Sequence, residues 1–282
     1  MSQLRHGAPD SARNPYEKVH PVPEETAATA RADSAPRDAY LFATCVIDLF
    51  APEAGIDAAH VLDRLGVTVH FPEAQTCCGQ PAYTTGFPRD ARAVVARQLD
   101  LFPEPWPIVV PSGSCGGMLK WHWPRLFADD PALRAKAEDV AARTVEFTDY
   151  VVNTLGTALP AHDAPATRVA LHTSCTARRE MGTLECGRAL LGGLPGVECV
   201  TQAHESECCG FGGTFAVKHP EVSAAMAADK LAAIAESGCD SYVSADCGCL
   251  LNLNLTRDRD GTGPRGVHIA SFLRARLDGA PV

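Results

Sequence analysis

The chain has 282 residues, of which 46% are hydrophobic and 21% charged, a composition typical of globular proteins with a sizeable core. Its formal net charge of -9 argues against binding to nucleic acid through a basic surface. No run approaches the roughly 20 apolar residues that cross a bilayer, and the polar N-terminus has no apolar signal-peptide core. We therefore expect a cytoplasmic protein without a transmembrane segment.

Residues 1–38 are rich in proline, alanine and charge but contain few large apolar side chains. Such a segment cannot bury enough surface to offset the entropy lost on ordering. We predict a disordered N-terminal tail over 1–38, followed by two domains over 39–160 and 161–282.

From residue 39 onward, short apolar runs alternate with helical patterns. In the first half, we predict strands over 40–45, 67–71 and the beginning of 107–115, and helices over 57–65, 89–102 and 133–155. In the second half, we predict strands over 168–175, 197–200 and 241–245, and helices over 188–191 and 220–237. Strands that alternate with helices indicate an α/β fold with mainly parallel sheets.

Eight of the 12 cysteines form two copies of one pattern: a single Cys, an adjacent Cys-Cys pair followed by Gly, and a second single Cys. The first copy is Cys45, Cys77, Cys78 and Cys115, and the second is Cys175, Cys208, Cys209 and Cys249. Matching cysteines are 130, 131 and 134 positions apart. This repeat indicates internal duplication, and it predicts two similar lobes related by a pseudo-two-fold axis.

Each single cysteine follows a predicted strand, so the thiols should gather at the carboxyl ends of the strands, where open α/β sheets bind ligands. Four thiolates suit a soft metal, either zinc or an iron–sulfur cluster. Adjacent cysteines are awkward ligands for one zinc ion, which favours a cluster with several iron atoms. The glycines beside the pairs would allow the backbone to approach such a cluster and donate hydrogen bonds to it: Gly79, Gly210, Gly212 and Gly213.

These residues resemble the paired cysteine-rich "CCG" domain family, which includes the B subunit of heterodisulfide reductase, the iron–sulfur subunit of glycolate oxidase and lactate utilisation protein A. The resemblance covers roughly 38–277 and is closest to the lactate utilisation proteins. It rests on ECCGFGGTFAVK (207–218), PEVSAAMAADK (220–230), LHTSC (171–175), PSGSCGGM (111–118) and ADCGCLLN (245–252).

The resemblance implies an iron–sulfur electron-transfer subunit that works with other subunits to oxidise L-lactate to pyruvate. In the heterodisulfide reductase relatives, five cysteines per domain hold a non-cubane cluster, and the last two form a CxxC motif. Here Met118 and Asn252 occupy the second position of that motif, so each half keeps four matching cysteines. We therefore expect one [4Fe–4S] site per half, with Cys247 as an additional candidate ligand and His172 beside the second site.

Other functions remain open from the residues alone. The chain has no Gly-rich dinucleotide fingerprint after its first strand, so electrons would pass to or from another subunit rather than a bound nicotinamide or flavin. One alternative is a thiol/disulfide redox subunit of the heterodisulfide reductase kind. Another is a zinc-bound or metal-free scaffold, and a third is redox chemistry of the adjacent cysteines through vicinal disulfides.

Overall fold

The computed structural model describes residues 37–156 and 158–280. Nearly all of the predicted tail lies outside these residues, and the first strand, β1, begins at Asp38. No helix within the described ranges is both long enough and apolar enough to span a membrane.

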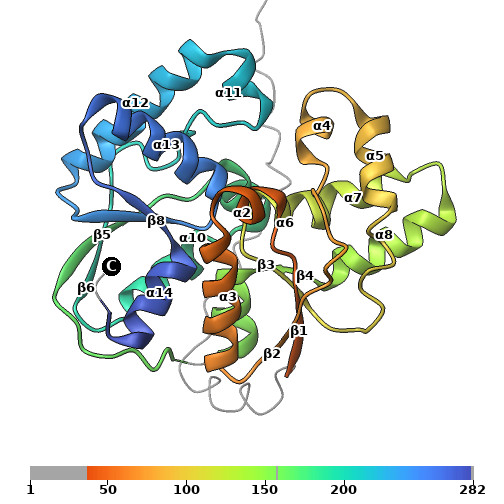
Figure 1. Ribbon diagram of the computed structural model, residues 1–282, viewed down its shortest axis with the longest axis horizontal. Helices are drawn as coiled ribbons and strands as arrows, with labels where there is room; N and C mark the ends of the chain where they lie inside the picture. Colours follow the sequence, from red (N-terminus) through yellow and green to blue (C-terminus); the bar gives the residue numbers. More distant parts are fainter. Residues whose placement is uncertain (1–36, 157, 281–282) are drawn as a thin grey trace, which may run out of the picture.

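The first half forms one parallel sheet flanked by helices (Figure 1). Its strands are β1 (Asp38–Leu41), β2 (Thr68–His70), β3 (Ile108–Val110) and β4 (Thr144–Glu146). Its α-helices are α2 (Cys45–Phe50), α3 (Pro52–Arg64), α4 (Gln80–Thr84), α5 (Pro88–Ala96), α6 (Gly113–Gly117), α7 (Trp123–Leu126), α8 (Pro131–Arg143) and α9 (Phe147–Asp149). Two π-helical segments complete it, η2 (Met118–His122) and η3 (Tyr150–Leu155).

The second half repeats this arrangement. Its strands are β5 (Thr167–Leu171), β6 (Val197–Val200), β7 (Ser241–Ser244) and β8 (Gly266–His268). Its helices are η4 (Ala177–Met181), α10 (Leu184–Gly192), α11 (Thr214–Lys218), α12 (Pro220–Glu236), α13 (Cys247–Asp260) and α14 (Ile269–Asp278).

The two sheets have the same strand order, β2-β1-β3-β4 and β6-β5-β7-β8, and every strand pair is parallel. The registers match as well: Tyr40 of β1 pairs with Ile108 of β3, and the equivalent Ala170 of β5 pairs with Tyr242 of β7. The predicted fold of two similar α/β lobes is therefore confirmed.

Proline marks the beginning of several helices. Pro52, Pro88 and Pro220 are the first residues of α3, α5 and α12. Proline suits this position because its missing N–H would have no partner within the helix and its fixed φ is already helical. Gly66 and Gly156, which follow α3 and η3, adopt positive φ values of 81° and 60°.

The predicted long helix over 133–155 is wrong. Helix α8 ends at Arg143, and the next three residues form β4, the edge strand of the first sheet. The apolar residues before and after β4 keep a helical spacing. The spacing of apolar residues alone therefore predicts one continuous helix. The equivalent edge strand of the second sheet, β8, also has only three residues and was not predicted.

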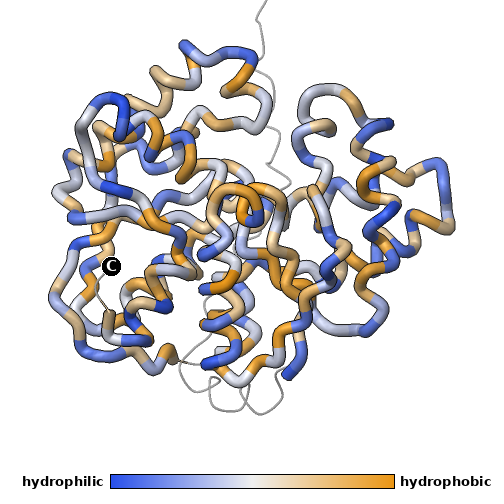
Figure 2. Tube along the Cα trace, viewed as in Figure 1, coloured by the Kyte–Doolittle hydropathy of each residue, from blue (hydrophilic) through white to orange (hydrophobic). Residues whose placement is uncertain are grey.

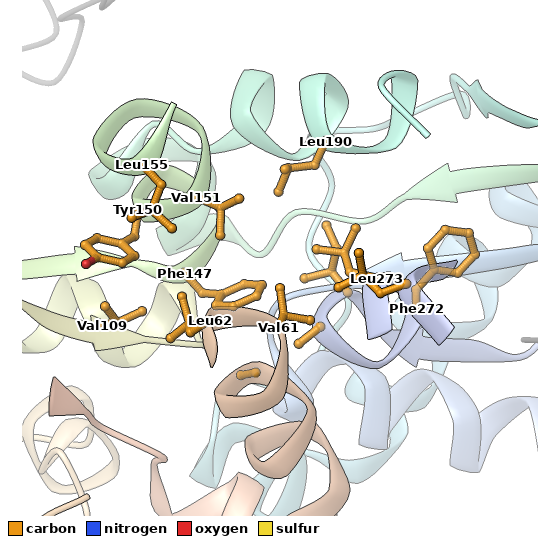
Figure 3. Close-up of a cluster of buried hydrophobic side chains, with 14 of the residues drawn as sticks. Val61, Leu62, Val109, Phe147, Tyr150, Val151, Leu155, Leu190, Phe272 and Leu273 are labelled. Atoms are coloured by element: carbon orange, nitrogen blue, oxygen red, sulfur yellow. The ribbon is translucent and has the colours of Figure 1, made fainter. Parts of the chain in front are cut away.

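A single hydrophobic core joins the two lobes. Val61 and Leu62 of α3, from the first half, lie in one buried cluster with Phe272 and Leu273 of α14, from the second half (Figure 3). The same cluster includes Tyr150 of η3 and side chains of both sheets. Along α3, hydrophobic and hydrophilic residues alternate on the trace, as expected of a helix with one face in this core (Figure 2). The lobes therefore pack as halves of one molecule.

Candidate metal centres

The four predicted thiols of the first half come together at the carboxyl end of the sheet. Cys45 begins α2, four residues after the end of β1, and Cys115 lies in α6, just after β3. The loop after β2 brings the adjacent pair to them. Cys78 Sγ lies 3.3 Å from Cys115 Sγ, and the Cys45 and Cys77 side chains are hydrogen-bonded to each other. We call these four residues the first thiol group.

The second half reproduces the arrangement with its own four thiols. Cys175 Sγ lies 3.5 Å from Cys208 Sγ, and Cys209 Sγ lies 3.0 Å from Cys249 Sγ. As in the first half, each single cysteine contacts one member of the adjacent cysteine pair. We call these four residues the second thiol group.

Each thiol group has a buried side and a more accessible side. Cys78 and Cys115 are buried in the first group, as are Cys209 and Cys249 in the second. The remaining two thiols of each group are half-buried: Cys45 and Cys77, and Cys175 and Cys208. A metal held by either group would therefore lie close to the surface.

One thiol of each adjacent pair is favoured as a thiolate. Hydrogen bonds from Cys45 and Cys78 hold the pKa of Cys77 well below its ordinary value. Hydrogen bonds from Cys175 and Cys209 do the same for the pKa of Cys208. The thiolate is the form that binds metals, so each group is prepared to lose its first proton at one defined sulfur.

Glycine shapes both cysteine-pair loops. Gly79 and Gly210 adopt left-handed φ values of 86° and 83°, and each donates its N–H to the sulfur two residues earlier, over 3.4 Å. In the second loop, Gly212 and Gly213 also have positive φ values, 51° and 62°. The positive φ turns the backbone N–H toward the thiolate, as expected for a loop that wraps a metal centre.

Three side chains hold the two loops in place. Gln98 is 1% exposed and donates its amide to the Cys77 carbonyl over 2.7 Å. Trp123 donates its indole N–H to the Cys78 carbonyl, and Asn252 donates its amide to the Cys209 carbonyl, both over 2.9 Å. Asn252, which replaces the last cysteine of the CxxC motif, thus supports the loop instead.

Cys247 lies at the interface between the lobes. It is buried with Ile47 and Ala54 of the first half, and burial raises the pKa of its thiol to about 12. The equivalent residue in the first half is Gly113, where an added Cβ would lie only 2.4 Å from the Ala177 Cβ of the second half. Cys249 Sγ lies 3.0 Å from Cys209 Sγ, whereas Cys247 packs against the first half. The proposed ligands therefore include Cys249 and not Cys247.

A hydrogen-bonded pair beside Cys247 links the loops of the two thiol groups. Ser112 and Asp246 occupy equivalent positions, three residues before Cys115 and Cys249. Ser112 Oγ donates to Asp246 Oδ1 over 2.9 Å, and the Ser114 backbone N–H donates to the same oxygen over 3.0 Å. The pseudo-two-fold axis therefore passes close to this contact.

His172, predicted to lie beside the second site, does so. It directly follows β5 and is 1% exposed. One of its ring nitrogens and the sulfur atoms of Cys209 and Cys249 are donor atoms that lie within 4.8 Å of one another. Lys230 is also buried, and it donates hydrogen bonds to the carbonyls of His204 and Glu205, in the loop before Cys208.

The donor set of both groups fits a soft metal centre. Four converging sulfur atoms, backbone N–H donors aimed at two of them, and a thiol with a lowered pKa match what zinc or an iron–sulfur cluster requires. The first group would hold its metal through Cys45, Cys77, Cys78 and Cys115. The second would hold its metal through Cys175, Cys208, Cys209 and Cys249.

The duplicated sheet and thiol groups define a class of protein with two cysteine-rich domains. In agreement, the family model "CCG: Cysteine-rich domain" matches the chain twice, over 39–120 and 169–254. The fold also resembles a crystal structure of a hypothetical protein from Helicobacter pylori, with a TM-score of 0.62 and 10% identity over 86% of this chain. The match spans about half, 49%, of that longer chain, and it supports the fold alone.

Curated relatives narrow the class further. Lactate utilization protein A of Bacillus velezensis is 41% identical over 239 residues, which is 84% of this chain and 98% of that protein. The proteins of the same name from Geobacillus kaustophilus and Bacillus subtilis (strain 168) are 42% and 39% identical over the same shares of both chains. The chain belongs to the lactate utilization protein A family.

Proposed function

We propose that the chain is an iron–sulfur electron-transfer subunit of a system that oxidises L-lactate to pyruvate. The observation that carries the proposal is the pair of equivalent four-thiol groups, each built around adjacent cysteines. Adjacent thiolates suit a cluster because each sulfur can bind a different iron atom. Membership of the lactate utilization protein A family supports the substrate.

The chain's own residues would hold and tune the two centres. A bound iron–sulfur cluster supplies one-electron redox chemistry. Gly79 and Gly210 donate N–H groups to the thiolate sulfurs, which stabilises negative charge there. The half-buried thiols, Cys45 and Cys77 in the first group, leave one side of each centre near the surface for a partner.

The electron count of the reaction agrees with two centres. Oxidation of lactate to pyruvate releases two electrons and two protons, and two one-electron centres accept one electron each. Substrate oxidation would take place in a partner subunit of the complex, and this chain would pass the electrons onward to an acceptor. We propose that both centres work in the cytoplasm.

The test is the metal content of the full chain purified without oxygen, measured together with its visible absorption and EPR spectra. Two four-iron clusters require about eight iron and about eight acid-labile sulfide per chain. Zinc in place of iron, or protein without metal after anaerobic reconstitution, would contradict electron transfer and support the scaffold or thiol-redox functions.

Matched variants assign the centres to the halves. Cys77→Ser should remove about half of the iron and leave the second centre, and Cys208→Ser should do the reverse. Cys186→Ser is a suitable control, since Cys186 is buried and lies outside both thiol groups. If either ligand variant loses all of its iron while still folding, the chain holds one shared centre instead of two.

A further inference from the structure

His172 is a buried histidine with unmet hydrogen-bonding capacity. Its side chain is 1% exposed, and neither Nδ1 nor Nε2 has a hydrogen-bond partner within the described part of the chain. Leaving a buried polar group unpaired costs about 1–3 kcal/mol. Such an imidazole therefore points to a partner that the polypeptide does not itself supply.

The spacing of the surrounding donor atoms suits a metal better than a hydrogen bond. The donor atoms of His172, Cys209 and Cys249 lie within 4.8 Å of one another, yet the imidazole is not hydrogen-bonded to either sulfur. A metal ion bonds to a histidine nitrogen at about 2.0–2.1 Å and to a cysteine sulfur at about 2.3 Å. These bond lengths place a nitrogen and a sulfur on one metal atom at most about 4.4 Å apart, so the three donors need only a small side-chain movement to share one metal.

Asp246 is placed to become the outer partner of His172 if the histidine binds a metal. A histidine ligand usually donates its second ring N–H to a carboxylate or a water molecule. His172 and Asp246 line the same small cavity at the lobe interface, and Asp246 Oδ2 is buried without a hydrogen-bond partner among the residues described. The other carboxylate oxygen, Asp246 Oδ1, already accepts a hydrogen bond from Ser112 Oγ.

The first half shows that the fold does not require histidine at this position. The equivalent residue, 130 positions earlier, is Phe42, which is fully buried. Its ring packs against Phe102 and Trp123, with ring centroids 6.3 Å and 6.2 Å apart. An apolar ring therefore fills this site in one half, and the second half carries a costly polar ring in its place.

From this geometry we propose that His172 is a direct ligand of the metal held by Cys209 and Cys249, so that the second centre has a nitrogen donor and the first has thiolates alone. The proposal rests on the proposed function for the presence of metal centres. A histidine that takes the place of a thiolate ligand raises the reduction potential of an iron–sulfur centre. With His172 bound in place of one of the four thiolates, the second centre should be the more easily reduced of the two.

The decisive experiment is pulsed EPR of the reduced full chain, reconstituted with iron and sulfide and labelled with 15N only in histidine. We examine the second centre in Cys77→Ser protein and the first centre in Cys208→Ser protein. The expected result is a strong coupling to one histidine nitrogen in the second centre and its absence from the first. The reduction potential of each centre is measured on the same samples.

His172→Phe reproduces the residue of the first half and should abolish the nitrogen coupling while shifting the potential of the second centre toward that of the first. His268→Phe is the control: His268 is also buried in the second half, but its ring is already hydrogen-bonded to the carbonyls of Pro111 and Ala245. It should leave the coupling unchanged.

The outcomes separate this inference from the proposed function. Two iron centres with no histidine coupling in protein that retains His172 would overturn the inference and leave electron transfer intact. A coupling that survives His172→Phe would overturn it as well, because another histidine would then be the ligand. If the reconstituted chain holds no metal at all, both proposals fail together, because His172 then has no metal to bind.

Discussion

Glu146 places a carboxyl group in the interior of the first half. It is fully buried, and its Oε2 accepts hydrogen bonds from the Thr148 hydroxyl and from the backbone N–H groups of Thr148 and Asp149. These bonds cap the turn that follows β4, yet Oε1 has no partner within the described residues. Burial is the main cause that raises the pKa of Glu146 to about 8.

This raised pKa predicts a stability that falls with rising pH. Below pH 4.5 the carboxyl is protonated in both states, but between pH 4.5 and 8 the unfolded state ionises while the folded state stays neutral. At 1.36 kcal/mol per pKa unit, the full loss is about 5 kcal/mol. Glu146→Gln has no such loss, so its free energy of unfolding should rise relative to wild type between pH 5 and pH 8. Urea denaturation at both values measures the change, and an equal difference at both would contradict the prediction.

Lys230 shows how one buried cation supports the second centre. Its amine holds the carbonyls of His204 and Glu205, in the loop that leads to Cys208. Lys230→Met leaves both carbonyls unpaired, which should cost about 1–3 kcal/mol and make the second centre lose metal faster to a chelator. Lys136→Met, at an exposed ion pair with Asp100, is the control and should change stability by less than about 0.5 kcal/mol. Equal rates of metal loss in the two variants would rule out this role.

At the scale of elements, the two cysteine-pair loops depend on glycine to different degrees. In Gly210→Ala, the new Cβ would lie 2.6 Å from the Ser223 backbone carbonyl oxygen. In Gly79→Ala, the nearest atom is a methyl group of Val95 at 3.3 Å, which can move. Both positions also have a positive φ, which costs a residue with a Cβ about 1–2 kcal/mol.

We therefore expect Gly210→Ala to lose most of the metal of the second centre and Gly79→Ala to keep more of the first. Iron content per chain, measured on folded protein, tests the order. Gly86→Ala isolates the conformational cost, because Gly86 has a φ of 87° but no atom within 4 Å of an added Cβ. Its iron content should match that of wild type. The same iron loss in all three variants would show that backbone conformation, not the close contact, decides.

The elements that the sequence predicted well are those marked by strong local signals. The strand 197–200 is found at the same residues, and the predicted helix 220–237 differs from α12 by one residue, because proline and glycine delimit it. The predicted strand 40–45 ends at Leu41 instead, since Thr44 caps a short helix that begins at Cys45. The short helices around the thiols form through contacts with residues far away in the chain, so the local sequence does not predict them.

The candidate site divides in the same way. The repeat spacing was sufficient to find both thiol groups and the glycines beside them, because duplication preserves sequence positions. Gln98, Trp123 and the Ser112–Asp246 contact were not found, since each acts across 21 to 134 positions of chain. The equivalence of Cys247 with Gly113 was visible in sequence, but the role of Cys247 at the interface required the packing of the lobes.

At the scale of the molecule, the shared core predicts that the two halves unfold together. All three tryptophans, at 106, 121 and 123, lie in the first half, whereas Phe272 lies in the second half within the core cluster that joins them. Phe272→Ala should destabilise the protein by about 3–5 kcal/mol. The tryptophan fluorescence transition should shift by the same amount as far-UV circular dichroism. A fluorescence transition that stays in place would mean that the halves unfold separately.

The Ser112–Asp246 contact has a consequence for how such a protein can specialise. In a homodimer of identical subunits, a residue on the symmetry axis meets its own copy, so the interface must be self-complementary. Two copies of the second half alone would place two buried Asp246 carboxylates against each other, and like charges at that distance repel. Joining the halves in one polypeptide removes this constraint. Each lobe can then acquire residues that its counterpart lacks. Two unequal sites can favour transfer from one site to the other, which two identical sites cannot do.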